Sequence, residues 1–261
     1  QPVGCIGQTS VKSPETLRSA RVLVRLISLE NCPEDFSVKI TRATNTQNRI
    51  EKRDFVTLDP QQDRLKTELL LDGKVYHYIR TDEVVTTDDN NYTLEESTIA
   101  LACQYSDIRL AVLAKRELGR LWEDISEEPY TLIFNASTTA SQLWKAVKVL
   151  RIVNANLKSK EKATGHGRER GFYVHANRFI LHLVFRLIPP EIILDPSSEF
   201  EKYVGEKLPG MIDKLVAISR AKMEDLYPEP SLVHQVFRNF TKCENIKSEV
   251  LRLRATKAIP R

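Results

Sequence analysis

Apolar and polar residues alternate along residues 21–29 (RVLVRLISL), a segment rich in Val and Ile. A period of two places the apolar side chains on one face, so we predict a strand with one buried face. The Pro-Glu-Asp sequence at residues 33–35 then predicts a helix start, because proline suits the first turn and acidic side chains suit the positive end of the helix dipole. Apolar residues at helical spacing extend this helix to about Thr44, and residues 45–49 end it.

A second helix is predicted from the Asp59-Pro60 pair, in which the aspartate caps the helix and the proline occupies its first position. Its apolar stripe consists of Leu65, Leu69 and Leu70. The Asp72-Gly73 pair ends the helix, and residues 75–79 form a short strand. A polar loop at residues 81–93 leads to a helix that is capped by Thr93.

The rest of the chain shows mostly helical periodicity. The predicted helices cover residues 94–105, 108–122, 141–156, 172–188, 199–223, 231–240 and 244–255. Residues 158–171 (KSKEKATGHGRERG) are basic, contain glycine and lack periodicity, so we predict a loop there. The sequence thus predicts an α+β protein that is predominantly α-helical, with a small α/β part at residues 1–93 followed by a helical bundle at 94–261. Because few strands are evident, we expect upstream sequence to complete the sheet.

Composition adds little to this picture. The chain has 261 residues, of which 41% are hydrophobic and 28% are charged, as is usual for globular proteins. No segment has the ~18 consecutive apolar residues of a membrane span. The net charge of +4 permits an acidic partner. The cysteines are far apart and there is no secretory signal, so we expect reduced thiols in a cytoplasmic protein. The abrupt start at Gln1 is expected of a piece of a larger protein.

Uncharged polar residues form the first candidate site. The candidate ligand-binding residues are Thr44, Asn45, Gln47, Asn48, Arg53 and Asp54, together with Gln8 and Thr9 from the glycine-containing start of the chain. Amide and hydroxyl groups suit recognition of phosphates, sugars or base edges. Alternatively, the polar side chains satisfy the carbonyls at a helix end, Arg53 and Asp54 form a local ion pair, and residues 4–10 are an ordinary turn.

Basic residues form the second candidate site, since between Lys145 and Arg186 they are opposed only by Glu161 and Glu169. The candidate nucleic-acid contacts are Lys158, Lys160, Lys162, Arg168 and Arg170. Such side chains can neutralise phosphates, and nearby aromatic rings can stack on bases. A run of charges can equally be a solvated face.

No catalytic or metal motif is evident. His175 and His182 would lie two helical turns apart, about 10 Å, which is too far for one ion, so we expect them at a helix–helix contact. There is no H-E-x-x-H, phosphate-binding loop, nucleophile elbow or nuclease-type carboxylate spacing. The sequence therefore identifies no catalytic residue and leaves open whether the chain is an enzyme. It predicts no metal ligand and no cofactor, and a divalent metal would have to be held by residues that no motif marks.

Three segments together resemble the AIPR family, the abortive infection phage resistance proteins of bacteria. They are residues 40–50 (ITRATNTQNRI), 52–55 (KRDF) and 59–65 (DPQQDRL), which match the family pattern ATN-x-QN, then RD, then P-x-Q followed by Leu. Residues 167–179 look like a later family segment. Residues 3–9 look like the remains of the family's V-N-G-C-Q-T motif.

The resemblance implies antiphage defence, by acting on or sensing nucleic acid through a polar pocket and a basic surface. The family's domain has an upstream half with an N-N-G motif and, in many members, a restriction-endonuclease-like region. That half has no counterpart in this sequence, so we expect any nuclease activity to reside there. The alternative is a non-catalytic interaction or regulatory domain of a larger defence protein, or an inactive fragment. The expected partners are nucleic acid, another defence subunit or the missing N-terminal half, and not a membrane.

Overall fold

The computed structural model describes residues 28, 30, 32–33, 35–37, 39–40, 52–79 and 88–255. Contacts divide the chain into two compact units, Gln1–Thr46 and Gln47–Arg261. In the first unit the described residues 36–37 and 39–40 are helical, and the Phe36 N–H donates to the Pro33 carbonyl, as the predicted helix start requires. The strand predicted at residues 21–29 lies, apart from residue 28, outside the described residues.

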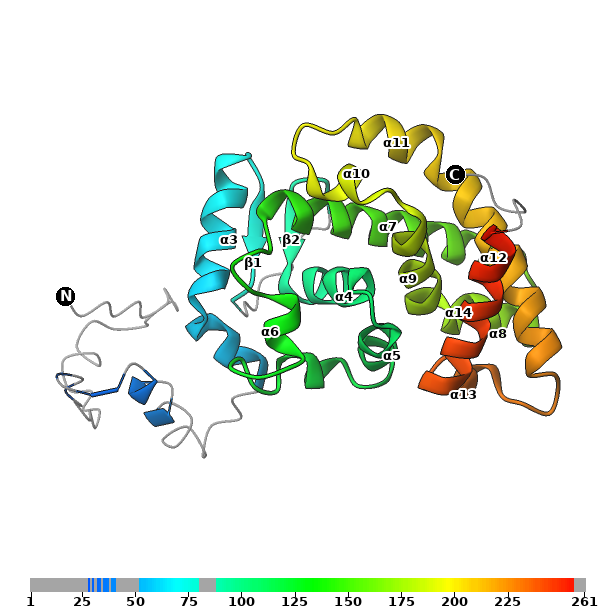
Figure 1. Ribbon diagram of the computed structural model, residues 1–261, viewed down its shortest axis with the longest axis horizontal. Coiled ribbons are helices and arrows are strands. Elements are labelled where there is room, and N and C mark those ends of the chain that lie inside the picture. Colours follow the sequence, from blue (N-terminus) through cyan, green and yellow to red (C-terminus); the bar gives the residue numbers. More distant parts are fainter. Residues whose placement is uncertain are drawn as a thin grey trace, which may run out of the picture. The chain divides into compact units, whose positions relative to one another are not determined.

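The second unit is mostly helical and contains a small sheet (Figure 1). Its elements in chain order are η1 (Lys52–Leu58, a 3₁₀ helix), α3 (Pro60–Leu71), β1 (Val75–His77), β2 (Asn91–Thr93), α4 (Leu94–Gln104), α5 (Ile108–Arg116), η2 (Leu118–Trp122, 3₁₀), α6 (Tyr130–Ile133), α7 (Ala140–Ala163), α8 (Arg168–His175), α9 (Asn177–Leu187), α10 (Pro190–Leu194), α11 (Phe200–Glu206), α12 (Leu208–Leu226), α13 (Val233–Val236) and α14 (Phe240–Ala255). The predicted α+β class with predominant helix is confirmed.

Helix α3 begins and ends as predicted. The Asp59 carboxylate accepts the N–H of Gln61 at 3.0 Å, and Gly73, with φ of 70°, follows the last turn. Leu65 and Leu69 are fully buried, but Leu70 is 64% exposed. Its assignment to the apolar stripe was wrong, because Leu65 and Leu69 lie one turn apart and the next residue is rotated by about 100° away from them.

The sheet consists of two parallel strands, with Tyr76 of β1 opposite Tyr92 of β2. Both tyrosines are buried. Strand β1 is shorter than the predicted strand at residues 75–79, and β2 lies within the segment predicted as a polar loop. Three residues with one large apolar side chain are too few to show the alternation that marks a strand.

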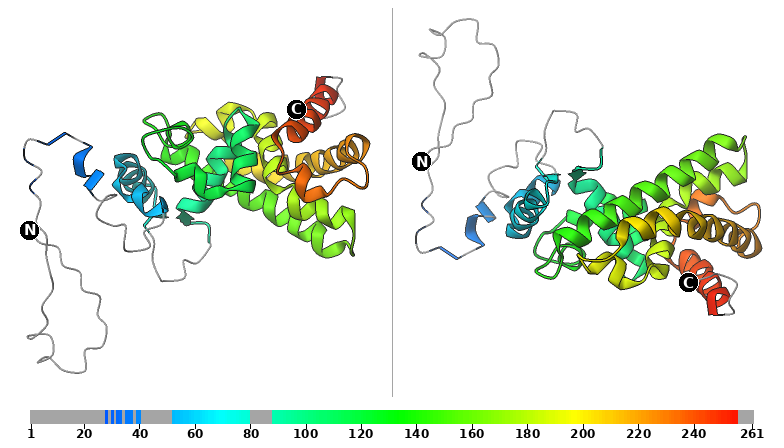
Figure 2. Two further views of the ribbon diagram at one scale, coloured as in Figure 1. Left: turned by 90° about the horizontal axis from the view of Figure 1, so that it is seen from below. Right: turned by 90° about the horizontal axis from the view of Figure 1, so that it is seen from above.

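Helix α4 lies at the centre of the second unit, where α5, α7 and α9 pack around it (Figures 1 and 2). It is capped by Thr93 as predicted, since the threonine hydroxyl accepts the N–H of Glu96. Its residues from Ser97 to Cys103 are all buried. Burial of each large apolar side chain contributes roughly 1.5–3 kcal/mol, so this helix is an important part of the core.

The prediction of a loop over residues 158–171 is wrong. Residues 158–163 form the last turns of α7, and α8 begins at Arg168, so only residues 164–167 connect the two helices. Lys, Glu and Ala favour helix intrinsically. Most of these turns are exposed, so they lack the apolar periodicity on which the prediction relied. Gly167, with φ of 109°, occupies a conformation that favours glycine.

Other helices are interrupted where the sequence predicted continuity. The segment at 172–188 breaks at Ala176 into α8 and α9, and the segment at 108–122 becomes α5 and η2. Helix α12 begins at Leu208 with a proline in its first turn, which ends the preceding α11. Residues 52–93 were expected in the N-terminal part, but they lie in the same compact unit as the helical bundle. Within the part of the chain that the structure describes, no helix combines the length and apolar composition needed to cross a bilayer.

Candidate functional site

The predicted polar cluster is described only in part. Gln8, Thr9, Thr44, Asn45, Gln47 and Asn48 lie outside the described residues. Arg53 and Asp54 lie in η1, which leads into the capped start of α3. The Thr57 hydroxyl donates to the Asp54 carbonyl at 2.7 Å. A site that combines these residues with the start of the chain stays a prediction.

Arg53 borders a buried polar region under α3. It is half-buried, and its Nε makes no hydrogen bond. Burial raises the pKa of the Tyr76 hydroxyl far above its ordinary value, and the positive charge of Arg53 partly opposes that shift. Arg53 therefore lies close enough to Tyr76 to act on it electrostatically.

A chain of hydrogen bonds occupies this region. The Tyr76 hydroxyl donates to Gln62 Oε1 at 2.7 Å, and Gln62 Nε2 donates to the Tyr130 hydroxyl at 2.8 Å. The Tyr130 hydroxyl in turn donates to Asp59 Oδ2 at 2.5 Å. Gln62 is fully buried. The amide thus links β1 to α6, and its carbonyl and amino groups each have a partner.

Arg64, two residues after Gln62 in α3, also bonds to residues of other elements. Arg64 Nη2 donates to the carbonyls of Thr138 at 2.7 Å and Asn135 at 3.2 Å, and its Nη1 pairs with Glu68 at 2.7 Å. The segment at residues 59–65, which carries part of the family resemblance, therefore holds α3 against β1, α6 and the start of α7.

Replacing Gln62 by Leu is expected to lower the free energy of unfolding by about 2–3 kcal/mol, because the Tyr76 and Tyr130 hydroxyls would lose buried partners. Urea denaturation measures this loss. The matched variant Gln61→Leu removes an amide whose bond to Arg64 is only part-buried, so a loss below about 1 kcal/mol is expected. Equal losses in the two variants would refute a structural role for the buried amide.

Three of the five candidate nucleic-acid contacts form ion pairs within the chain. Lys160 pairs with Asp213 at 2.9 Å, and Arg170 pairs with Glu161 at 3.1 Å. Arg168 pairs with Glu224 at 2.7 Å and also donates to the carbonyls of Tyr227 and Ser231. These side chains tie α7 and α8 to α12 and the segment after it.

Lys158 and Lys162 differ from these three residues. Both are exposed in the last turns of α7, and among the described residues neither has a carboxylate at ion-pair distance. They remain the candidate phosphate contacts of this segment.

Basic residues earlier in α7 also have internal partners. Arg151 pairs with Glu96 at 2.9 Å and donates to the carbonyl of Asn91 at 2.5 Å, so it connects α7 to β2 and α4. Lys148 pairs with Glu201 at 2.7 Å. Five of the ten Lys and Arg side chains between Lys145 and Arg186 are therefore paired in the fold with acids from other elements.

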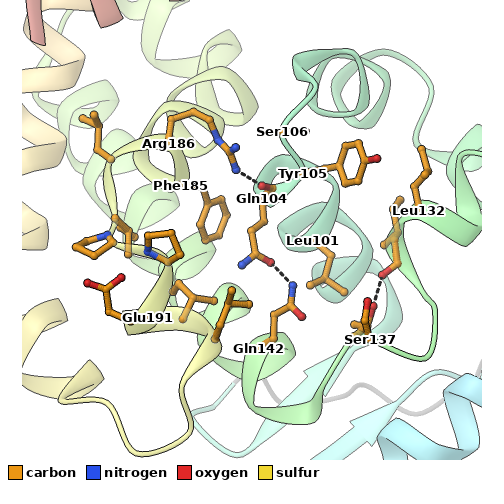
Figure 3. Close-up of a pocket in the computed structure, with 18 of the residues that line it drawn as sticks. Leu101, Gln104, Tyr105, Ser106, Leu132, Ser137, Gln142, Phe185, Arg186 and Glu191 are labelled. Atoms are coloured by element: carbon orange, nitrogen blue, oxygen red, sulfur yellow. Dashed lines mark hydrogen bonds between the residues drawn. The ribbon is translucent and has the colours of Figure 1, made fainter. Parts of the chain in front are cut away.

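A cavity of about 860 Å³ opens between the ends of α4 and α9, α6, α10 and the start of α7 (Figure 3). The Gln142 amide donates to Gln104 Oε1 at 2.9 Å, and the Arg186 guanidinium donates to the Gln104 carbonyl. Glu191 supplies a carboxylate, and apolar side chains such as Phe185 form much of the remaining wall. Such a mixed lining suits a small polar ligand. No local motif marks this cavity, because its residues come from distant segments of the chain.

The two histidines considered as a pair lie on different helices, α8 and α9, rather than two turns apart on one helix. His182 is fully buried, and its Nδ1 lies 3.0 Å from the Cys103 carbonyl. In the described part of the chain, no three His, Cys, Asp or Glu side chains gather closely enough to hold a metal ion. Burial also raises the pKa of the Cys103 thiol to about 12, so that thiol is inert as a nucleophile.

Comparison with known proteins identifies the family. A family model described as AIPR protein matches residues 1–195, which include every described element through α10. The chain therefore belongs to the AIPR family, as the sequence motifs indicated. Membership supports a role in abortive infection, a form of antiphage defence. No curated protein and no solved structure gives a significant match.

Proposed function

We propose that this AIPR chain serves antiphage defence by binding nucleic acid through exposed basic side chains. The observation that carries the proposal is the contrast within one segment: Lys158 and Lys162 have no carboxylate at ion-pair distance among the described residues, whereas Lys160, Arg168 and Arg170 do. Exposed ammonium groups can neutralise phosphates and release the counterions bound to them. The polar residues around Asn45 and Gln47 would contribute hydrogen bonds to sugars or base edges.

The position of the two lysines is compatible with this function. They lie near the connection between α7 and α8, at one end of the second unit (Figure 2). A basic side chain in the last turn of a helix also interacts favourably with the helix dipole. That interaction would explain Lys162 without any ligand but not Lys158, which lies before the last turn, so binding measurements separate the two explanations.

The double variant Lys158→Glu/Lys162→Glu should bind a short random-sequence duplex about tenfold or more weakly than the parent chain at low salt. Fluorescence anisotropy of a labelled duplex measures this loss. The matched control is Lys202→Glu/Lys222→Glu, which makes the same change in net charge at two lysines already paired with carboxylates three residues away. Equal weakening in both variants would indicate a general charge effect and contradict the proposed contact.

A second candidate function is that of an interaction domain for another defence subunit. It is favoured by exposed apolar side chains at the end of α3, in β1 and just after β1, where Leu71 is 83%, Val75 is 43% and Ile79 is 52% exposed. Exposed apolar surface next to a short sheet is typical of a protein contact. If this function were the principal one, the Lys158→Glu/Lys162→Glu variant would keep full protection against phage.

A further inference from the structure

Five basic side chains from four helices and a following turn form a cluster that the sequence analysis did not identify. This basic junction consists of Lys115 (α5), His175 (α8), Arg178 (α9), His234 (α13) and Arg238 (after α13). Helix α5 packs against α9, and α13 packs against α8 (Figure 1). The junction residues are separated along the chain by other segments, so no local motif marks them.

Hydrogen bonds and ring contacts fix the centre of the basic junction. Lys115 Nζ donates to Asn177 Oδ1 at 2.9 Å and to the Val174 carbonyl at 3.1 Å, which ties the end of α5 to the turn between α8 and α9. The rings of His175 and His234 lie 5.9 Å apart between centroids. The cationic groups are therefore held by contacts between helices and not by one flexible segment.

Acidic side chains do not balance this charge. Among the described residues, no carboxylate lies at ion-pair distance from any member of the basic junction. The exposed Glu95 of α4 acts on Arg178 from a greater distance. Lys115 and His175 are influenced by basic neighbours only. This arrangement contrasts with Arg151 and Arg168, which are paired.

The like charges weaken one another's protonation. Burial, together with the charges of Arg178 and Arg238, lowers the pKa of Lys115 to about 8. Burial, together with the charges of Lys115, His234 and Arg238, lowers the pKa of His175 below its ordinary value. Arg178 Nη1 is buried and has no hydrogen-bond partner within the described part of the chain. An unpaired buried donor among like charges costs free energy, which a bound anion would offset.

We propose that the basic junction binds a phosphate group, with Lys115, Arg178 and Arg238 as charged donors and the two histidines as further donors. A phosphate has enough oxygens to accept from several donors at once, and guanidinium groups match its geometry. The phosphate belongs either to a nucleic acid backbone, in which case the inference rests on the proposed function, or to a small phosphate-bearing molecule.

Protonation and binding are then linked. A bound phosphate favours the charged forms of His175 and Lys115, so it raises both pKa values. Affinity for a phosphodiester, whose charge is constant in this range, therefore increases as the pH falls below about 8. The titratable and charged groups that face this site are the five basic side chains, the Cys103 thiol and Glu95, of which the last two act on Arg178.

Titration of the full chain with inorganic phosphate, followed by NMR of the histidine rings, tests the inference. The expected result is a rise of about one unit in the pKa of His175. Arg238→Gln, a change at an exposed side chain, should weaken phosphate binding about tenfold. The control Arg252→Gln, at an arginine paired with Glu249, should leave it unchanged. An unchanged His175 titration at millimolar phosphate would overturn the inference.

Duplex binding by the same variants separates the two phosphate sources. If Arg238→Gln weakens both phosphate and duplex binding, the backbone of a nucleic acid occupies the basic junction. If it weakens phosphate binding alone, the site is confirmed for a small phosphate-bearing molecule and plays no part in duplex binding. Duplex binding that depends on Lys158 and Lys162, together with no response of His175 to inorganic phosphate, would support the proposed function and refute the phosphate site.

Discussion

Replacing Lys145 by Met is expected to lower the free energy of unfolding by about 3 kcal/mol. The lysine is only 1% exposed, and its ammonium group has three neutral acceptors. Nζ donates to the Asp195 carbonyl at 2.6 Å, the Ser198 hydroxyl at 2.8 Å and the Ile192 carbonyl at 3.3 Å. Methionine fills similar volume but donates nothing, so these acceptors would lose a charged donor between α7 and the segment that connects α10 to α11.

Lys148→Met in the same helix is the matched control. Lys148 pairs with Glu201, whose side chain is 64% exposed, and a pair in that environment contributes about 1 kcal/mol or less. Urea denaturation of both variants measures the difference. A similar decrease in the free energy of unfolding at both positions would contradict the conclusion that the buried hydrogen bonds of Lys145 hold helices together.

Acidification from pH 6.5 to 4 is expected to destabilise the parent chain by about 3 kcal/mol more than a His182→Asn variant. Burial, helped by the charge of Arg186, lowers the pKa of His182 from 6.5 to about 3. In the unfolded chain the same ring takes up a proton near pH 6.5. Between these two pKa values the unfolded state binds a proton that the folded state does not, so stability falls as the pH falls.

Asparagine is chosen because its amide can donate to the Cys103 carbonyl from the position of Nδ1, which lies 3.0 Å from that oxygen. Free energies of unfolding for the parent and variant, each measured at both pH values, give the comparison. His166→Asn, at an exposed histidine, is the control and should retain the pH dependence of the parent. A His182→Asn variant with the same acid sensitivity as the parent would refute the argument.

Local signals predicted the local structure well. The caps at Asp59 and Thr93 and the stop at Gly73 depend on residues within a few positions of one another, so the sequence contains the whole interaction. Strand β2 was missed because its pairing with β1 depends on a partner 16 residues away in register. The end of α7 was missed because exposed helix carries no apolar periodicity.

The sequence could not show which basic side chains are paired with acids in the fold. The acids that neutralise the basic stretch, such as Glu96, Asp213 and Glu224, belong to α4 and α12, which are far away along the chain. In the basic junction, by contrast, basic residues that are scattered along the sequence lie close together, and among the described residues no carboxylate lies at ion-pair distance from them.

Of the predicted polar site, only Arg53 and Asp54 lie among the described residues. The most informative family residue is Gln62, whose role depends on Tyr76 and Tyr130, 14 and 68 positions away. An amide in a motif can bind a ligand or hold the fold together, and the sequence alone does not distinguish these roles. Here burial and two tyrosine partners favour the structural role.

The most direct test of the proposed nucleic-acid contact is the salt dependence of duplex affinity for the full chain and for the Lys158→Gln/Lys162→Gln variant. Each lysine that neutralises a phosphate contributes about 0.9 to the slope of log affinity against log salt concentration. The account predicts that the variant's slope is smaller in magnitude by about 2. Identical slopes, or no binding by the parent chain at low salt, would contradict it.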